Sequence, residues 1–397
     1  MNPGPPCVLT INGGSSSIRF AIYEASGSPN VVLEGKVTRI GTSGTRLEVK
    51  GGTAQAFDAG DHRTAARGLL DWLEARPEFA RVQAAGHRVV HGMQHQEPER
   101  VTPALLEELR GLAASDPDHL PAEIALMEVF QDRHASLPQV ACFDTAFHRT
   151  LPRVAQLLPL PRWLDEQGVR RYGFHGLSYA FLMEELARLG DPAARQGRVI
   201  LAHLGSGASM AAVRDGVSID TSMGFTPCSG LPMSTRSGDL DAGLAGYLAR
   251  SEGMTIDQFH DMVNHESGLL GVSGISPDIR DLLDKEGSDV RATEAVELFC
   301  YQAKKCIGSL AAALGGVDAL VFAGGIGENS ATIRSRICAG LQFLGIELDE
   351  TLNQAQAPLV SKGTVRVRVI PTNEERMIAR STARLLGLDQ PSAHPQS

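Results

Sequence analysis

Five charged or imidazole side chains stand in otherwise apolar stretches of this sequence. Arg88 lies within GHRVVHG, Asp144 ends VACFD, and His175 lies in YGFHG. Arg236 follows in MSTRSGD, and Glu374 stands in PTNEE. Each alone has a structural interpretation, such as an ion pair, a turn cap or a satisfied core histidine. Together they are the set that a kinase needs, with cationic donors for the moving phosphoryl group and carboxylates for Mg²⁺.

Three glycine-rich turns could bind the phosphates. The first, Asn12 to Ser17, joins two β-rich runs, and HLGSGAS repeats the pattern nearly half a chain later. Backbone N–H groups of such turns can converge on an anion, and serine hydroxyls add donors. A plain hairpin is the alternative for one turn alone, but the repetition favours a pair of phosphate-facing loops. The third turn, GGIGENS, would let a nucleotide approach the backbone, although it matches neither the dinucleotide nor the P-loop motif.

The elements that position these residues alternate between strands and helices, which is typical of an α/β fold. VLTINGGSSSIRFAIYEASG and VILAHLGSGASMAAVRDGVS both read as strand, turn and strand, which predicts two copies of one unit. Apolar residues three and four apart predict helices over 64–75 and 121–134. Strands are predicted over 84–92 and 139–148.

The end of the sequence predicts a strand, a proline stop, a helix and a free tail. VRVRVIP alternates and stops at a proline, and the helix that follows ends at Gly387. Thr372 and Glu375 have the spacing of a capping box. A second helix is predicted from about Ser330, after the strand DALVFA and its glycines.

Length and composition limit the class of protein. The chain has 397 residues, 43% hydrophobic and 21% charged, which is enough for two globular lobes with a cleft between them. The net charge of −9 and the lack of a Lys/Arg cluster argue against a nucleic-acid partner. No targeting or membrane segment is recognised, and the six cysteines lack C-x-x-C spacing, so we expect a cytoplasmic protein.

Ten blocks of the sequence resemble the acetate kinase family, in the family's order and at about its separations, from about Val8 to Gly387. They are INGGSSSIRF, GHRVVHG, FDTAFH, RRYGFHGLSY, HLGSGAS, DTSMGFTP, STRSGDLD, GVSGIS, GGIGENS and IPTNEE. The family belongs to the acetate and sugar kinase, Hsc70 and actin superfamily, whose two duplicated ribonuclease-H-like lobes close on ATP at an active-site cleft. The resemblance implies reversible, Mg²⁺-dependent transfer of phosphate from ATP to acetate, with Mn²⁺ as an alternative metal, in a homodimer.

The resemblance also implies the bounds of the two lobes and the role of individual residues. Residues 1–148 with 375–397 would form the N-terminal lobe on the acyl and phosphoryl side, and residues 149–374 the nucleotide-binding lobe. The implied catalytic residues are Asn12, Arg88, His119, Asp144, His175 and Arg236. The implied metal ligands are Asn12, Asp144 and Glu374, and the implied acyl pocket is Val90, Phe174 and Pro227. The implied ATP contacts are Ser15, Ser16, Ser17, Arg19, His203, Gly205, Ser206, Gly207, Asp278, Arg280, Gly325, Ile326, Gly327 and Glu328.

Several positions depart from the family pattern. Ser206 replaces an Asn that contacts phosphate, and Met93 replaces the second Gly of VVHGG. The family's PLHNPPN reads PDHLPAE here, so that Asp118 and Leu120 flank His119. Ser234 and Ala242 replace a Gly and a Pro. Burial of an unpaired carboxylate is costly, so we expect Asp118 to face solvent or to pair with His119 or a cation.

Four alternatives stay open. Propionate is a rival substrate, because one methylene changes discrimination by only about 1–3 kcal/mol. A sugar kinase of the same superfamily would need a general base for the hydroxyl, whereas Arg88 and Arg236 suit a carboxylate better. An actin-like ATP-binding scaffold without turnover is a non-enzymatic alternative, against which the retained charged residues argue. A relative that uses pyrophosphate would block the adenosine pocket, whereas GGIGENS keeps its small residues.

Overall fold

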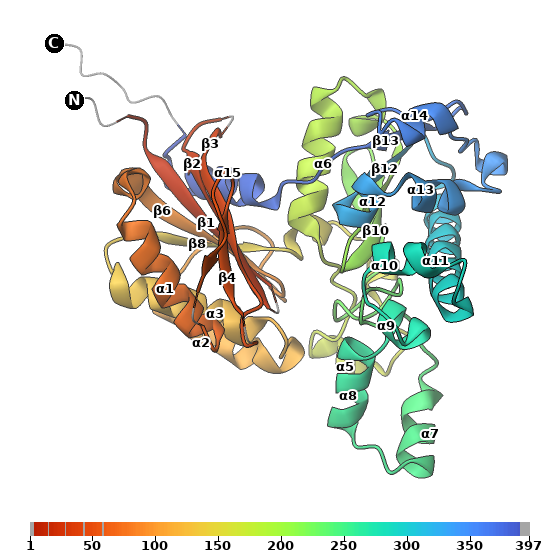
Figure 1. Ribbon diagram of the computed structural model, residues 1–397, viewed down its shortest axis with the longest axis horizontal. Coiled ribbons are helices and arrows are strands. Elements are labelled where there is room, and N and C mark those ends of the chain that lie inside the picture. Colours follow the sequence, from red (N-terminus) through yellow and green to blue (C-terminus); the bar gives the residue numbers. More distant parts are fainter. Residues whose placement is uncertain (1–3, 15, 28, 43, 58, 390–397) are drawn as a thin grey trace. The chain divides into compact units, whose positions relative to one another are not determined.

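The computed structural model describes residues 4–14, 16–27, 29–42, 44–57 and 59–389. The chain divides into two compact units (Figure 1). Unit 1 comprises Met1–Ala146 and Asn373–Ser397, and unit 2 comprises Phe147–Thr372. Ser15 and the tail after Asp389 lie outside the described residues.

Unit 1 is built on one mixed sheet. Its strands are β1 (Cys7–Gly14), β2 (Ser17–Glu24), β3 (Val31–Thr38), β4 (Arg46–Val49), β5 (Gln55–Ala56), β6 (Val82–Val89), β7 (Glu99–Arg100) and β8 (Gln139–Phe143). They lie in the order β5-β4-β3-β2-β1-β6-β8-β7. The hairpin β1–β2 is antiparallel, whereas β1, β6 and β8 run parallel to one another. The carboxyl ends of these three strands therefore meet at one edge of the sheet.

Helices cover both faces of this sheet. One face packs against α1 (His62–Glu74) and α3 (Leu120–Arg133), with α2 (Pro103–Leu112) beside α3. The other face receives α15 (Glu374–Leu386) from the end of the chain. Its approach is close, because a Cβ on Gly86 would lie 2.3 Å from the Thr382 hydroxyl. Glycine on β6 thus lets α15 lie directly on the sheet.

Unit 2 has a five-stranded sheet. Its strands are β9 (Arg198–Leu204), β10 (Ala208–Arg214), β11 (Val217–Thr221), β12 (Ala319–Ala323) and β13 (Arg366–Val369), in the order β11-β10-β9-β12-β13. Three antiparallel strands are followed by two parallel ones, as in β3-β2-β1-β6-β8 of unit 1. The repeated order confirms the predicted duplicated α/β fold.

Eleven α-helices are described in unit 2. They are α4 (Arg153–Gln156), α5 (Arg162–Glu166), α6 (Gly176–Arg188), α7 (Gly243–Ser251), α8 (Ile256–His265), α9 (Gly268–Ser273), α10 (Ile279–Lys285), α11 (Val290–Leu314), α12 (Gly324–Asn329), α13 (Ala331–Cys338) and α14 (Glu350–Gln354). Helices α6 and α11 lie on opposite sides of the sheet (Figure 1). Short 3₁₀ turns lie at Pro77–Arg81, Ala113–Ser115, Ala146–His148, Pro192–Ala194 and Gln342–Leu344. Over the described part of the chain, no helix has the length and apolar character needed to cross a bilayer.

Most predicted elements are confirmed within a few residues, but three predictions are wrong in detail. The capping box at α15 does not form, because Asn373 is the N-cap and its side chain accepts from the Arg376 N–H. The GGIGEN stretch is the helix α12 rather than an open loop. Strand β8 ends at Phe143, and the residues after it turn away from the sheet. All six cysteines are free thiols.

Candidate functional site

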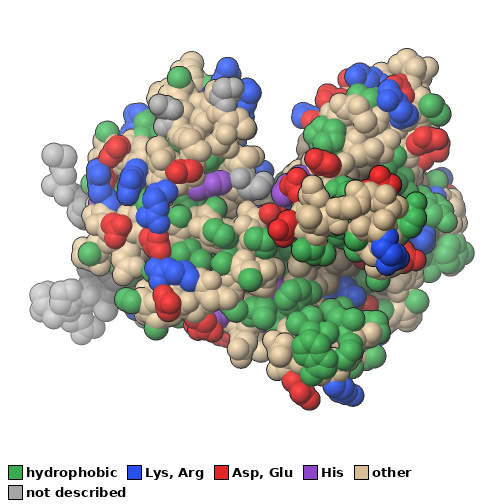
Figure 2. All heavy atoms as spheres, turned by 90° about the horizontal axis from the view of Figure 1, so that it is seen from below, with side chains coloured by type: hydrophobic (Ala, Val, Ile, Leu, Met, Phe, Trp, Pro, Cys, Tyr) green, Lys and Arg blue, Asp and Glu red, His purple; other side chains and the backbone are tan. Residues whose placement is uncertain are grey.

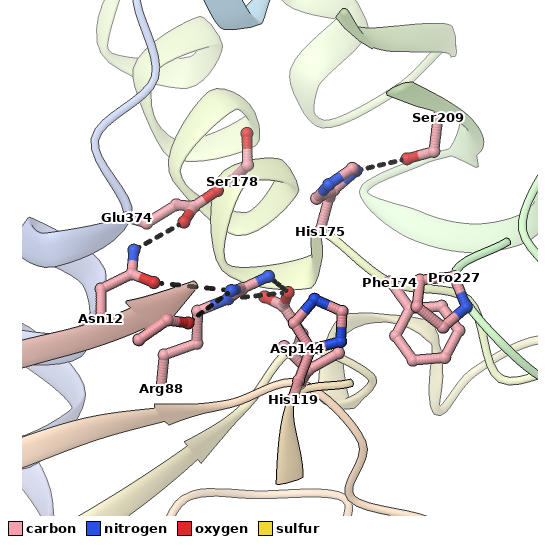
Figure 3. A network of polar contacts seen from close by, with 12 residues as sticks. Asn12, Arg88, His119, Asp144, Phe174, His175, Ser178, Ser209, Pro227 and Glu374 are labelled. Atoms are coloured by element: carbon pink, nitrogen blue, oxygen red, sulfur yellow. Dashed lines mark hydrogen bonds and ion pairs between the residues drawn. The ribbon is translucent and has the colours of Figure 1, made fainter. Parts of the chain in front are cut away.

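The carboxyl-end edge of the unit 1 sheet gathers four of the predicted site residues. Asn12 lies near the end of β1, Arg88 near the end of β6, and Asp144 directly after β8. Glu374 begins α15, which packs on the same strands. The parallel pairing of these strands brings together residues that are far apart in sequence (Figure 3).

Arg88 and Asp144 form a buried ion pair. The Arg88 Nε and Nη2 atoms lie 3.0 and 2.6 Å from Asp144 Oδ2, and Asp144 is fully buried. Burial alone would lower the pKa of Arg88, but nearby carboxylates, Asp144 above all, raise it beyond its ordinary value. The guanidinium is therefore a fixed positive charge.

Asn12 connects this pair to α15. Its Nδ2 donates to Glu374 Oε2 at 2.9 Å and to Glu375 Oε1 at 3.2 Å, and Arg88 Nη1 lies 3.5 Å from its Oδ1. Burial, and then the charge of Glu374, raise the pKa of Glu375. Arg19 stands opposite Asn12 in the β1–β2 hairpin, with an exposed side chain. Two adjacent carboxyl groups thus share one amide, an arrangement that would gain from a nearby cation.

Two buried acids in this region were not predicted as site residues. Glu123 on α3 accepts the Val90 N–H at 3.0 and 3.2 Å with its two oxygens, and so holds the residue that follows β6. Asp116 Oδ1 lies 2.8 Å from Nδ1 of His119, the N-cap residue of α3. Asp118, the acid considered from the sequence, is only half-buried. The stretch DPDHLPAE contains Asp116, Asp118 and Glu123. Asp116 and Glu123 are buried, whereas Asp118 is half-buried.

Unit 2 has a second polar cluster, made of imidazoles and hydroxyls. The rings of His175 and His203 stack with centroids 4.2 Å apart. His175 Nδ1 lies 2.8 Å from Ser209 Oγ, which also bonds the Tyr179 hydroxyl (Figure 3). His203 Nδ1 lies 2.8 Å from Ser178 Oγ. Each ring is thus oriented through its Nδ1 atom.

His175 adopts a strained backbone conformation. It has φ +59° and precedes α6 as its N-cap residue. A left-handed conformation is uncommon for a residue other than glycine, and such residues gather at functional sites. A Cβ on Gly207 would lie 3.3 Å from His175 Nε2 and 3.9 Å from Arg236 Nη1, so this turn adjoins both side chains. Arg236 also donates to the Pro227 carbonyl at 3.2 Å.

Two of the glycine-rich segments lie side by side in unit 2. Strands β9 and β12 are parallel neighbours, and a Cβ on Gly205 would lie 3.7 Å from the Gly325 backbone N. Gly324 has φ +75°, and a Cβ there would lie 2.7 Å from the Leu204 carbonyl. Gly325, by contrast, has open space where a side chain would be. The N-terminal turn of α12 can therefore be approached closely by a ligand.

The other predicted residues have simpler positions. Glu328 Oε1 accepts the N–H groups of Gly324 and Thr372, so it holds α12 and the start of the PTNEE stretch. Asp278 caps α10 and pairs with Arg280, whose side chain is exposed. The remaining predicted positions divide by burial. Ser16 and Ser206 are exposed, Ser17 is half-buried, and Val90, Phe174, Ile326 and Gly327 are buried.

Sequence reasoning also missed Ser178, Ser209, Tyr179 and Thr372. The Ser178 hydroxyl lies 2.7 Å from the Thr372 hydroxyl. Ser178 and Tyr179 stand in RRYGFHGLSY, Ser209 in HLGSGAS and Thr372 in IPTNEE, so the motifs themselves held the signal.

Known proteins resemble this chain over most of its length. The model of the Acetokinase family matches residues 7–380. Acetate kinase of Rhodopseudomonas palustris is 45% identical over 391 residues, covering 95% of this chain and 98% of the relative. Propionate kinase of Citrobacter rodentium is 42% identical over 398 residues, covering 97% and 98%. The crystal structure of a propionate kinase from Francisella tularensis has a TM-score of 0.90 at 35% identity, covering 96% of this chain and 99% of that one. For the Porphyromonas gingivalis acetate kinase structure, the TM-score is 0.86 at 35% identity, covering 96% and 100%.

Proposed function

This chain belongs to the Acetokinase family, and we propose that it transfers the γ-phosphoryl group of ATP to acetate, reversibly. The observation that carries the proposal is the guanidinium of Arg88, which is 13% exposed and is held by Asp144 beside Asn12 and Glu374. A fixed cation of this kind suits an anionic acceptor, whereas a hydroxyl acceptor would call for a general base.

The reaction requires no strong general base from the protein, because a carboxylate is already a competent nucleophile at neutral pH. A carboxylate oxygen of acetate attacks the γ-phosphorus, the bond from that phosphorus to the β–γ bridging oxygen breaks, and ADP leaves with the electron pair. The obstacle is the approach of two anions, whose repulsion at 4 Å is about 4 kcal/mol at an effective dielectric of 20. Positioned cations and hydrogen-bond donors offset that repulsion in the transition state.

We assign the cationic side chains to the two reactants. Arg88 binds the acetate carboxylate and the phosphoryl oxygens, and Arg236 binds the phosphoryl oxygens. His175, oriented by Ser209, and His119, oriented by Asp116, stabilise the transition state. The turns around Ser16 and Gly205 face the phosphates, and the segment around Gly325 faces the adenosine, with Asp278 and Arg280.

The residues of unit 1 fit a magnesium ion. Mg²⁺ prefers oxygen ligands and is commonly held by one or two carboxylates together with substrate phosphates. Asn12, Asp144 and Glu374 offer such oxygens, and Glu374 adjoins the half-buried Glu375 carboxyl, whose pKa is raised. In the described ranges, no set of three His, Cys, Asp or Glu side chains forms a metal site alone. The ion, which Mn²⁺ could replace, would neutralise charge on the ATP phosphates.

The preferred acid depends on the acyl pocket, for which we propose Val90, Phe174 and Pro227. The relatives named above include both acetate and propionate kinases, so propionate is the rival substrate. A substitution at Asp118 tests whether this residue faces the acyl pocket. If its carboxylate lies near the acyl group, Asp118→Leu lowers the KM for propionate more than that for acetate and leaves kcat unchanged. An unchanged acid profile would show that Asp118 does not face the pocket.

We also propose that the protein is a cytoplasmic homodimer. Figure 2 shows hydrophobic side chains gathered on the face that holds α7 and α8. The exposed members of this region include Leu240, Tyr247 and Ile256, the last with 73% of its surface exposed. Such a patch suits contact with a second copy, and six free thiols suit a reducing compartment. Light scattering that gives a monomer mass would contradict the dimer.

The test is acyl phosphate formation trapped with hydroxylamine, with ATP and Mg²⁺ and with acetate, propionate, butyrate and glycerol in parallel. Signal with acetate above that with propionate supports the proposal. Signal highest with propionate would correct the substrate but keep the reaction. No signal with any acid, from protein that still binds ATP, would indicate a scaffold without turnover.

A further inference from the structure

The turn before α3 buries an acid against a predicted catalytic histidine. Asp116 is 3% exposed and His119 is 9% exposed. His119 Nδ1 and Asp116 Oδ1 are 2.8 Å apart, and the Asp116 carbonyl accepts the N–H groups of His119 and Leu120 at 3.4 and 3.1 Å. Asp116 therefore contacts both the imidazole ring and the backbone N–H of His119.

This contact determines how the imidazole can act. A carboxylate only accepts hydrogen bonds, so the proton of the pair lies on Nδ1 of His119. Contact between the ring and a substrate must then come from Nε2. Among the described residues, Asp116 Oδ2 is buried and makes no hydrogen bond, so the imidazole is the principal partner of this carboxylate.

The other buried acid of this region, Glu123, makes a different contact. Burial, and then the charges of Asp116 and Asp144, raise the pKa of Glu123 to about 8, against the opposing effect of Arg88. Glu123 is therefore mostly protonated near pH 7 and holds the Val90 N–H. Asp118 lies in the same turn, half-buried. Of the two buried acids, Asp116 is the one committed to His119.

We propose that Asp116 is a positioning residue for His119, which holds the imidazole through Nδ1 so that Nε2 can contact the transferring phosphoryl group. The inference rests on the proposed function, because it assigns a purpose to His119 in that reaction. Asp116 itself touches neither substrate. Its effect should therefore appear in kcat and vanish when the imidazole is removed.

The experiment is a double-mutant cycle with Asp116→Ala and His119→Ala in the hydroxylamine assay. Asp116→Ala should lower kcat about 10- to 100-fold and leave the KM for ATP within twofold. In the His119→Ala background, the same change should lower kcat by less than about twofold. Asp116→Asn keeps an oxygen acceptor for Nδ1–H and should recover most of the lost activity, which also provides a variant of unchanged size if the alanine variant folds poorly.

A second measurement does not depend on turnover. Nitrogen-15 NMR of the imidazoles reports which ring nitrogen carries the proton. The wild-type protein should show a slowly exchanging Nδ1–H for His119, and Asp116→Ala should lose it while the His175 signal stays. A His119 ring protonated only at Nε2 would overturn the proposal.

Glu128→Gln is the matched control, because Glu128 lies on α3, the helix that His119 caps, and pairs with Arg63 and Arg110. It should keep kcat within twofold. Equal losses from Asp116→Ala in both backgrounds would show a structural role and overturn the positioning role. A wild-type kcat in Asp116→Ala would also overturn the positioning role, but it would leave the proposed function intact. An inactive wild-type protein would overturn the proposed function and the positioning role together.

Discussion

Units 1 and 2 share one strand order but hold different polar chemistry at the carboxyl ends of their strands. In unit 1 the groups at the ends of β6 and β8 are ionic, and the largely buried guanidinium of Arg88 is balanced by Asp144 and Glu374. In unit 2 the corresponding region holds two stacked imidazoles, each bonded to a serine hydroxyl. The shared topology thus fixes where polar side chains gather, whereas the local residues decide whether the cluster is ionic or hydrogen-bonded.

This difference has an energetic consequence. A buried ion pair depends on both of its charges, because removal of one leaves the other uncompensated. Removal of a serine hydroxyl from the unit 2 cluster loses hydrogen bonds but leaves no buried charge uncompensated. Unit 1 should therefore respond more strongly than unit 2 to single substitutions in its cluster.

The largest effect is expected from Arg88→Ala. Loss of the guanidinium leaves Asp144 buried without its partner, which should lower the free energy of unfolding by about 3–5 kcal/mol. Turnover should fall on the order of 10³-fold or more, because the charge that balances two anions is lost. Urea unfolding and the hydroxylamine assay measure the two effects.

Arg236→Ala is the contrast in unit 2. Its guanidinium donates to the Pro227 carbonyl at 3.2 Å. Turnover should fall about 10²- to 10³-fold, while ATP binding stays near wild type, because the charge is needed chiefly at the transferring phosphoryl group. Wild-type rates in Arg236→Ala, or wild-type stability in Arg88→Ala, would remove the proposed contrast.

Acid should weaken both units through one buried histidine each. Burial lowers the pKa of His87 in unit 1 and of His148 in unit 2 to about 4. Between pH 6.5 and 4 the unfolded chain takes up protons that the folded chain does not. The free energy of unfolding should therefore fall as the pH drops through this range, by up to about 3 kcal/mol for each ring.

Leucine substitutions separate the two histidines. His148 bonds Ser218 and the Phe174 carbonyl, whereas His87 packs edge-on against Phe130. His87→Leu should reduce the acid dependence with little loss of stability at pH 7, while His148→Leu should also lose stability at pH 7. Unfolding that shows the same pH dependence in both variants as in wild type would contradict the assignment.

A smaller effect is expected from Ser209→Ala. The change removes the hydroxyl that joins His175 to Tyr179, at a cost of about 1–3 kcal/mol in unfolding free energy. It should lower kcat about tenfold, the equivalent of about 1.4 kcal/mol. Ser178→Ala does the same for His203 and serves as the comparison. If only the Ser178 variant lost activity, His203 rather than His175 would be the ring whose orientation matters.

The smallest effect is expected from Met93→Gly. Met93 follows β6 and has φ +45°, whereas Gly324 follows the corresponding strand β12 with φ +75°. Glycine adopts positive φ at little cost, so the change should raise the free energy of unfolding of unit 1 by about 0.5–1 kcal/mol. Met93→Ala, which keeps the strain, is the control. Equal stability of the glycine and alanine variants would show that the backbone there is not strained.

The sequence by itself determined the two copies of one unit and most of the helices and strands, and it pointed to the lone charges that we assign to the site. Periodicity and turn residues are local signals, and Arg88 and Asp144 are conspicuous because apolar residues stand beside them. The family resemblance rests on the same local blocks of sequence.

Only the tertiary structure decided which of these groups are partners. Asn12 and Glu374 are 362 residues apart in sequence and hydrogen-bonded, and Ser178 and Thr372 are 194 apart. The predicted capping box at α15 is wrong because Asn373 caps the helix while the Thr372 hydroxyl bonds Ser178. Asp116 and Glu123 look like ordinary surface acids until their burial is known. Local propensity depends on neighbours in sequence, whereas burial and hydrogen-bond partners depend on which segments the fold brings together.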